Sequence, residues 1–268
     1  MRGLRRLVRT ASVGFDRLRP PPEGIPILIY HRVGRRTELG VDLPTKLFDE
    51  QMAYLAETYE VLELDETARR LDAADRGKPA VAVTFDDGTA DFVDEALPSL
   101  ERHGIRVTYY LATDYIERAQ VFPEDGIPMS WAAAREAVST GLVDIGSHTH
   151  THALLDRVTP EAAADELDRS IDLIGDRVGV QARHFAYPKA LLGTPAAESA
   201  VRARFRTATL ARTRTNRYGP VDLHRLTRSP IQMSDGMEYF VHKVEGGMRL
   251  ENDLRDVVNR WRYRGATS

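Results

Sequence analysis

Short apolar runs alternate along the chain with longer stretches in which apolar and polar positions follow a helical period. Seven of the apolar runs are predicted to be strands: Ile27–Tyr30, Tyr59–Leu64, Ala80–Phe85, Val107–Ala112, Val143–Gly146, His184–Tyr187 and Thr207–Ala211. A strand followed by a helix, repeated along one chain, is typical of a parallel sheet. The pattern therefore predicts an α/β fold whose sheet is closed or nearly closed.

The stretches between these runs predict helices. Phe48, Met52 and Leu55 recur at the spacing of one helical face. Thr159 followed by Pro160 is a typical helix start, because proline is tolerated at the first helical position. The chain from 236 to 268 is predicted to form a helical extension with a basic end.

Residues 1–23 form a basic N-terminal arm that ends in a run of prolines. Within it, one side of a helix would collect the apolar residues and the opposite side the arginines; the apolar set is Leu4, Leu7, Val8, Ala11, Phe15 and Leu18. Such a helix can rest on an anionic membrane surface. The alternative is a solvated, partly disordered arm.

The arm lacks the continuous apolar core of a secretory signal, because Arg5, Arg6 and Arg9 interrupt it. No later segment has the roughly 18 apolar residues needed to span a bilayer. We therefore expect a cytoplasmic location, with peripheral membrane contact through the arm as an option.

Composition narrows the class of protein. The 268 residues are 42% hydrophobic, which is enough for one large domain or two small ones. The net charge of -3 excludes the basic surface of a typical nucleic-acid-binding protein. The chain has no cysteine, so disulfides and thiolate metal sites are excluded, and any metal ion must be held by His, Asp or Glu.

Four polar clusters follow predicted strands directly. They are Tyr30-His31-Arg32, Asp86-Asp87-Gly88, the stretch 146–153 with the sequence GSHTHTHA, and Tyr187-Pro188. Reactive residues of parallel α/β folds gather at the carboxyl ends of strands. We expect these clusters to meet there and to form a site.

Two of the clusters offer metal ligands. Adjacent carboxylates such as Asp86 and Asp87 can address a cation and a water molecule separately, although Asp-Asp-Gly is also an ordinary turn sequence. Neutral imidazole together with carboxylate suits Zn²⁺ or a similar ion. Spacing alone leaves two ligand pairs open, His148 with His150 and His148 with His152.

These motifs resemble those of the polysaccharide deacetylase family, carbohydrate esterase family 4. The resemblance runs from about Ile25 to about Ile231 and rests on TFDDG at 84–88, SHTHTH at 147–152 and HFAYP at 184–188. The opening PILIYHRVG is similar to the exopolysaccharide or poly-N-acetylglucosamine branch, in which the motif order is circularly permuted. The resemblance implies a distorted (β/α)-barrel of about seven strands, with residues 24–235 as the catalytic domain.

The resemblance also implies roles for single residues. Asp86 matches the general base and His31 the general acid, while the backbone N–H of Tyr187 matches the oxyanion donor. The implied metal ligands are Asp87, His148 and His152, which leaves His150 as a spacer at the rim of the site. The implied metal ion is most often Zn²⁺, with Co²⁺, Ni²⁺ and Mn²⁺ as alternatives.

Substrate contacts and the orientation of the base are less closely defined. Tyr187, Pro188, Lys189 and Trp131 are the expected substrate-binding residues, although Trp131 also fits simple helix packing. Lys189 and Ala190 stand where the family motif usually has a glycine, and Lys189 is expected to reach an anionic group. Arg183 and Arg228 are both candidates for the arginine that orients Asp86.

The function implied is removal of N-acetyl groups from N-acetylhexosamine-containing glycans or glycoconjugates. The substrate is expected to be a glycan, a lipid-linked sugar or a small glycoside. Alternatives on the same fold are an O-acetyl esterase and a cyclic amide or imide hydrolase. A catalytically dead carbohydrate-binding protein is a further alternative. The segment from Asp114 to Met129 is the expected specificity loop.

Overall fold

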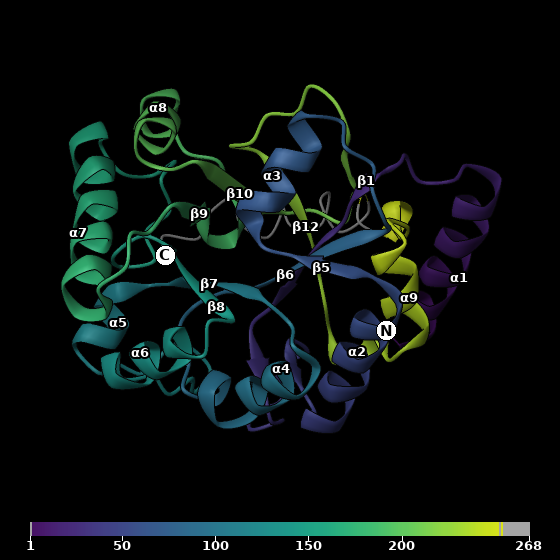
Figure 1. Ribbon diagram of the computed structural model, residues 1–268, viewed down its shortest axis with the longest axis horizontal. Helices are drawn as coiled ribbons and strands as arrows, with labels where there is room; N and C mark the ends of the chain where they lie inside the picture. Colours follow the sequence, from purple (N-terminus) through teal and green to yellow (C-terminus); the bar gives the residue numbers. More distant parts are fainter. Residues whose placement is uncertain (1, 252, 254–268) are drawn as a thin grey trace.

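The computed structural model describes residues 2–251 and 253. Its centre is a ring of parallel strands (Figure 1). Around the ring the strands follow the order β2 (Ile27–Tyr30), β12 (Leu226–Pro230), β10 (Thr207–Ala211), β9 (His184–Ala186), β8 (Val143–Ser147), β7 (Val107–Leu111) and β6 (Ala80–Phe85). β6 pairs with β2 and closes the ring. The predicted distorted barrel of about seven strands is confirmed.

One strand of the ring differs from the prediction. The predicted strand at Tyr59–Leu64 is the short β5 (Glu60–Leu62), which pairs only with the first half of β6 and stands outside the ring. Its place is taken by β12, which the apolar pattern does not predict. β12 joins β10 to β2 through Thr209 opposite Leu226 and Ser229 opposite Leu28.

Helices cover the outside of the barrel (Figure 1). The longer helices are α2 (Thr45–Thr58), α3 (Leu64–Asp72), α4 (Leu97–His103), α6 (Trp131–Ser139), α7 (Pro160–Val178), α8 (Pro195–Arg204) and α9 (Glu238–Val244). Shorter helical segments are the π-helical turn η1 (Phe92–Ala96), α5 (Thr113–Glu117), η3 (Met233–Asp235) and η2 (Pro188–Ala190), the last directly after β9. The predicted start of α7 is confirmed, because the Thr159 hydroxyl caps it by accepting the N–H of Ala162. Two small sheets, β1 (Gly24–Ile25) with β11 (Asn216–Arg217) and β3 (Arg32–Val33) with β4 (Asp42–Leu43), complete the fold.

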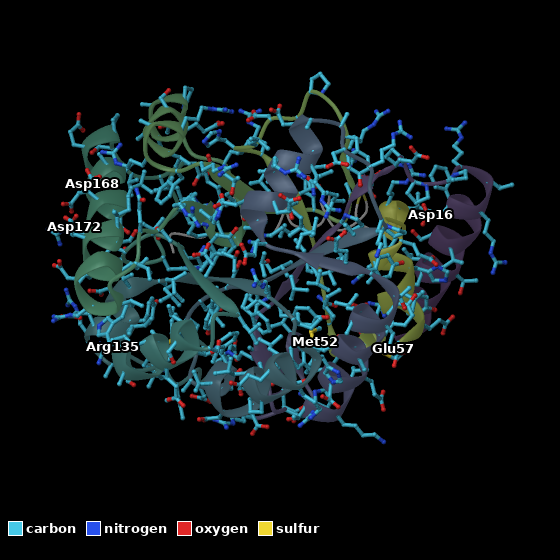
Figure 2. All side chains as sticks on the ribbon, in the orientation of Figure 1. Asp16, Met52, Glu57, Arg135, Asp168 and Asp172 are labelled. Atoms are coloured by element: carbon cyan, nitrogen blue, oxygen red, sulfur yellow. The ribbon has the colours of Figure 1, made fainter. Side chains whose placement is uncertain are left out.

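The core lies between the barrel and these helices. β6 is buried along its whole length, as expected for a strand of a parallel sheet that is covered on both faces. Phe85 at its end contacts Tyr30, Phe48 and Phe92, with ring centroids 4.9 to 5.8 Å apart. Charged side chains such as Asp168 and Asp172 of α7 point outward (Figure 2).

Helix α1 (Arg2–Leu18) at the N-terminus packs against the segment around residues 248–251. The predicted N-terminal arm forms this helix, which lies at the edge of the molecule beside α9 (Figure 1). The predicted single C-terminal helix is interrupted, because α9 ends at Val244 and helical backbone resumes only at Arg249. Most of the predicted extension beyond that point lies outside the described residues.

Candidate active site

The carboxyl ends of the ring strands hold the predicted site residues. His31 follows β2, Asp86 and Asp87 follow β6, His148 follows β8 and Tyr187 follows β9. Since all these strands are parallel, their carboxyl ends meet at one end of the barrel. The four polar clusters seen in the sequence therefore share one face of the fold.

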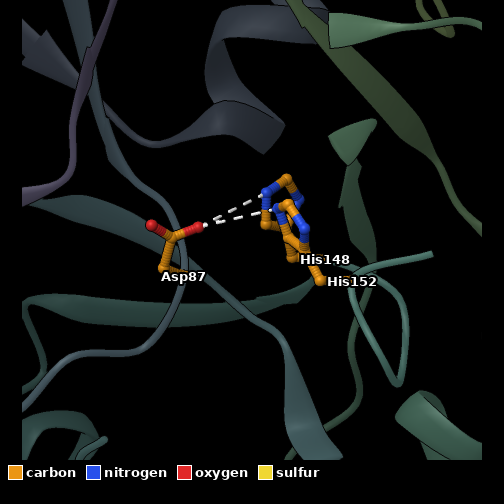
Figure 3. Close-up of side chains that lie close together, drawn as sticks. All are labelled: Asp87, His148 and His152. Atoms are coloured by element: carbon orange, nitrogen blue, oxygen red, sulfur yellow. Dashed lines mark ion pairs between the residues drawn. The ribbon is translucent and has the colours of Figure 1, made fainter. Parts of the chain in front are cut away.

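Asp87, His148 and His152 form a cluster that can hold a metal ion (Figure 3). One ligand atom from each lies within 4.8 Å of the others. The Asp87 Oδ1 is 3.8 Å from the His148 Nε2 and 3.9 Å from the His152 Nε2. Nitrogen and carboxylate oxygen together form a donor set that suits Zn²⁺.

Neighbouring groups prepare both imidazoles for ligation. The Nδ1–H of His148 donates to the carbonyl of Ala186 at 2.7 Å, which leaves the Nε2 lone pair facing the cluster. Burial lowers the pKa of His152 to about 4, and His148 and Lys189 act in the same direction. His152 is therefore neutral at physiological pH, as a metal ligand must be.

The backbone at the cluster is held in an unusual conformation. Asp87, Thr149 and His152 have φ of 82°, 64° and 62°, in the left-handed region that residues other than glycine rarely adopt. Glu166 of α7 holds the histidine loop by accepting the backbone N–H groups of His150 and Thr151. Such conformations persist where the surrounding structure fixes them, often at functional sites.

His150 stands apart from this cluster. Its Nε2 lies 3.3 Å from the Asp114 Oδ1, and its Nδ1 is 3.0 Å from the Thr113 hydroxyl. The side chain is buried rather than at a solvent-exposed rim, and it links the histidine loop to α5. Of the two ligand pairs that spacing left open, only His148 with His152 lies in the cluster.

Asp86 is held by Arg228, the arginine of β12. The Arg228 Nη1 donates to Oδ1 at 2.6 Å and the Nη2 to Oδ2 at 2.8 Å. Both side chains are almost completely buried, and burial alone would raise the pKa of Asp86; the charges of Arg228 and His148 outweigh it and lower this pKa to about 2. Arg183, the other candidate, pairs with Asp65 at 2.8 Å instead.

A layer of side chains beneath the cluster supports Arg228. Its guanidinium lies over the ring of Tyr110 at 5.1 Å from the centroid, and its Nη1 donates to the Thr84 hydroxyl. The ring of Tyr110 in turn lies against Gly146, where a Cβ would come within 2.5 Å of it. Sequence patterns gave no indication of these supports, because each acts through the arginine rather than on a ligand.

Gly146→Ala is therefore expected to destabilise the protein by about 1–3 kcal/mol through overpacking. The new Cβ would lie 2.5 Å from Tyr110 Cδ1 and 2.8 Å from the His184 carbonyl, and the latter cannot move away freely. Urea unfolding measures the change. Gly175→Ala is the matched control, since a Cβ there meets nothing within 4 Å and alanine favours the helix. Equal stability of the two variants would contradict the prediction.

Tyr187 departs from its expected role. Its backbone N–H donates to the carbonyl of Thr209 at 3.1 Å, as part of the pairing between β9 and β10. In this structure the N–H is therefore occupied and does not face an oxyanion. The Tyr187 hydroxyl is buried and has no hydrogen-bond partner among the described residues.

The remaining predicted substrate contacts divide into two groups. Pro188 and Lys189 form η2 directly after β9, and the effect of Lys189 on the pKa of His152 places its charge near the cluster. Trp131 packs against the core, and its indole N–H donates to Glu117 at 2.7 Å. These contacts fit the helix-packing interpretation of Trp131 and give no support to a sugar contact.

The predicted specificity loop, from Asp114 to Met129, is hydrogen-bonded to Arg32, the residue after His31. The guanidinium of Arg32 donates to the carbonyls of Pro123 and Glu124, and Tyr115 stacks on Phe122 at 4.2 Å. Between this loop and the segment after β3 lies an open polar pocket of about 480 Å³. It is lined by Arg35, Arg36, Thr37, Glu38, Leu39, Glu124 and Asp125.

Fold and cluster together define a parallel α/β-barrel protein with a candidate metal centre at the carboxyl ends of its strands. The chain belongs to the polysaccharide deacetylase family, whose model matches residues 73–208, about half of the chain. It is 28% identical over 169 residues to YxkH of Bacillus subtilis, which carries the name of the same family. That match covers 62% of this chain and spans 57% of the length of YxkH.

Two solved structures have a similar fold. The deacetylase PplD of Streptococcus pyogenes, in complex with acetate, is 22% identical with a TM-score of 0.73, and the match covers 83% of this chain and 99% of PplD. IcaB from Ammonifex degensii is 22% identical with a TM-score of 0.72, covering 84% of this chain and 98% of IcaB. At this identity the similarity supports the fold.

Proposed function

We propose that this protein is a metal-dependent hydrolase that removes N-acetyl groups from N-acetylhexosamine units of glycans or glycoconjugates. The observation that carries the proposal is the pairing of two groups at one end of the barrel. One is the cluster of Asp87, His148 and His152; the other is the separately held carboxylate of Asp86, whose Oδ2 is 3.7 Å from the His148 Nε2. Family membership supports acetyl groups on glycans as the class of substrate.

The cluster fits a divalent metal ion, and we propose Zn²⁺, with Co²⁺, Ni²⁺ or Mn²⁺ as alternatives. Three protein ligands are typical of catalytic rather than structural zinc sites. When bound, the ion supplies Lewis-acid activation of a water molecule and of the acetyl carbonyl.

Asp86 is proposed as the general base. Its low pKa keeps it ionised at physiological pH, so the carboxylate can accept a proton from the attacking water molecule. The two hydrogen bonds from Arg228 fix its orientation, which distinguishes it from Asp87. The adjacent aspartates therefore have separate roles in this proposal: Asp87 binds the metal ion and Asp86 moves the proton.

His31 is proposed as the general acid that protonates the departing amine. Its Nδ1 is buried and has no hydrogen-bond partner among the described residues, and a positive charge on its ring lowers the pKa of Asp86. The two side chains are therefore close enough to interact, from neighbouring strands of the ring. A protonated histidine ring can donate a proton to a departing amine, which is the role of a general acid.

His31→Ala is expected to lower acetate release by about 10²–10⁴-fold, because the amine would leave unprotonated. The metal content should remain that of the wild type, since His31 is outside the cluster. His224→Ala is the matched control, because the His224 Nε2 contacts the backbone carbonyl of Phe205 at 2.7 Å and His224 has no proposed role in the reaction. Loss of activity in the His224 variant alone would transfer the acid role to that residue.

An acetate-release screen tests the proposed function. The full-length protein, reconstituted with Zn²⁺ after chelation, is assayed on N-acetylglucosamine oligomers, acetylated xylan and a cyclic imide. We expect metal-dependent acetate release from the N-acetylated sugars. Hydrolysis of acetylated xylan alone would identify an esterase, and turnover of the imide alone a cyclic amide hydrolase. Metal binding without any turnover would support a carbohydrate-binding protein.

A further inference from the structure

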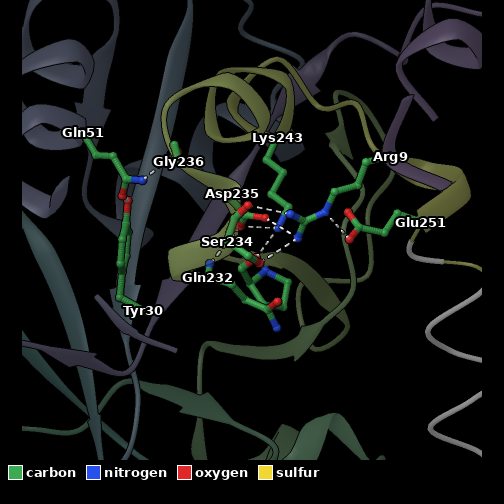
Figure 4. A network of polar contacts seen from close by, with 10 residues as sticks. Arg9, Tyr30, Gln51, Gln232, Ser234, Asp235, Gly236, Lys243 and Glu251 are labelled. Atoms are coloured by element: carbon green, nitrogen blue, oxygen red, sulfur yellow. Dashed lines mark hydrogen bonds and ion pairs between the residues drawn. The ribbon is translucent and has the colours of Figure 1, made fainter. Parts of the chain in front are cut away.

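Helix α1 turns its polar side toward the body of the protein. Arg9 and Ser12 are buried, and the Arg9 guanidinium donates to Asp235, to Glu251 and to the carbonyl of Ser234 (Figure 4). The Ser12 hydroxyl accepts the backbone N–H of Glu251. These partners lie on η3 and the C-terminal segment, so buried ion pairs and hydrogen bonds attach the helix.

The apolar stripe of α1 lies away from that attachment. Ala11 is exposed, Leu18 is 85% exposed, and Val8 and Phe15 are only partly buried in the part of the chain that the structure describes. A helix on the surface of a globular protein normally turns its apolar stripe inward and its charges outward. The orientation of α1 is the reverse, so its apolar stripe is available to a partner.

Positive charge surrounds this stripe. The guanidinium groups of Arg19 and Arg249 lie 5.9 and 5.7 Å from the centroid of the Phe15 ring, and Arg17 is exposed beside Leu18. Residues 2–19 contain arginine at positions 2, 5, 6, 9, 17 and 19 and a single acidic residue, Asp16. Asp16 is already engaged, because it accepts the backbone N–H of Met248.

We propose that this outer face of α1, formed by Val8, Ala11, Phe15 and Leu18 with the flanking arginines, docks the protein on an anionic lipid bilayer. Exposed apolar side chains between guanidinium groups match the boundary between acyl chains and negatively charged headgroups. The docking is peripheral, since no helix of the described chain has the length and apolar character to cross a membrane. The inference concerns binding alone and does not depend on the reaction at the barrel.

Vesicle co-sedimentation of the full-length protein tests the proposal. The vesicles contain phosphatidylcholine with phosphatidylglycerol, or phosphatidylcholine alone. We expect binding to the anionic vesicles only, weakened by salt because the headgroup attraction is screened. Leu18→Glu should lower the partition coefficient about tenfold or more, since it removes an apolar side chain that would enter the bilayer interface and adds a charge that the anionic headgroups repel.

Val121→Glu is the matched control. Val121 is 56% exposed in the loop after α5, so the same kind of substitution there should leave vesicle binding at the wild-type level. Both variants should unfold at the wild-type temperature, because neither side chain is buried. Equal binding of wild type and Leu18→Glu would overturn the proposal. A second outcome would also overturn it: the wild type does not bind vesicles, light scattering shows a dimer, and Leu18→Glu converts that dimer to a monomer. The outer face of α1 would then be an interface between two copies of the chain.

Discussion

Asp86→Asn is expected to lower acetate release by about 10²–10⁴-fold while the metal content stays at the wild-type level. Asparagine keeps the shape of the side chain but cannot accept a proton from water. The substitution leaves the ligand cluster of Asp87, His148 and His152 unchanged. Steady-state acetate release and elemental analysis of the same preparation measure both quantities.

The same substitution has a cost in stability that must be separated from its effect on turnover. It removes the negative charge opposite the buried guanidinium of Arg228, and an unpaired buried charge destabilises by about 3–5 kcal/mol. The thermal unfolding of the variant is therefore measured as well, and acetate release is assayed below its unfolding temperature. Asp91→Asn is the matched control. Asp91 is also buried, but its carboxylate accepts a hydrogen bond from the backbone N–H of Val33 instead of pairing with Arg228. Wild-type turnover in a folded Asp86→Asn variant would refute the base assignment.

The second large effect is expected for His148→Ala, which should lose the metal ion and, with it, the activity. Two remaining ligands hold a divalent ion weakly, and His148 is the residue whose Nε2 approaches both Asp86 and Asp87. Elemental analysis after dialysis against a weak chelator measures retention. Activity should not return when Zn²⁺ is added at the concentration that restores the wild type.

His150→Ala is the matched control for this variant. His150 is of the same residue type, lies two positions further along the same loop and is also buried, but it contacts Asp114 and Thr113 instead of the cluster. It should keep its ion. Loss of metal from both variants to the same extent would show that the loop as a whole, rather than one ligand, controls binding.

The candidate metal-binding residues could be predicted from the sequence. Asp86-Asp87 and the histidine stretch stand directly after strongly apolar strands, so their meeting at one end of a parallel barrel follows from the pattern. The choice of His152 over His150 did not follow from spacing, because loop backbone in the left-handed region decides where each ring points. Family resemblance supplied that choice.

Strand β12, in contrast, could not be predicted from the pattern of apolar residues. Its sequence, Leu-Thr-Arg-Ser-Pro, has one aliphatic residue, and a search for apolar runs passes over it. The structure nevertheless buries Arg228 and Ser229 almost completely. Arg228 is buried because it pairs with Asp86 at the candidate site. The strand therefore has polar residues at buried positions where apolar residues would be expected.

The orientation of helix α1 also could not be predicted from a local pattern. Its apolar stripe is evident in the sequence, and the usual assumption would turn that stripe toward the core. The ion pairs of Arg9 with Asp235 and Glu251 determine its orientation instead. Those partners are more than 200 positions away along the chain, so no local pattern indicates them.

Because β12 closes the barrel and carries Arg228, the proposed activity is expected only after this strand has been synthesised and inserted. Asp86 and Arg228 are 142 positions apart, so the carboxylate leaves the ribosome long before the cation that orients it. Until that strand inserts between β10 and β2, a nascent chain can already carry Asp87, His148 and His152, but it has neither a closed barrel nor the guanidinium that orients Asp86. Long-range pairing of this kind forms slowly, so activity should be among the last properties the folding chain acquires.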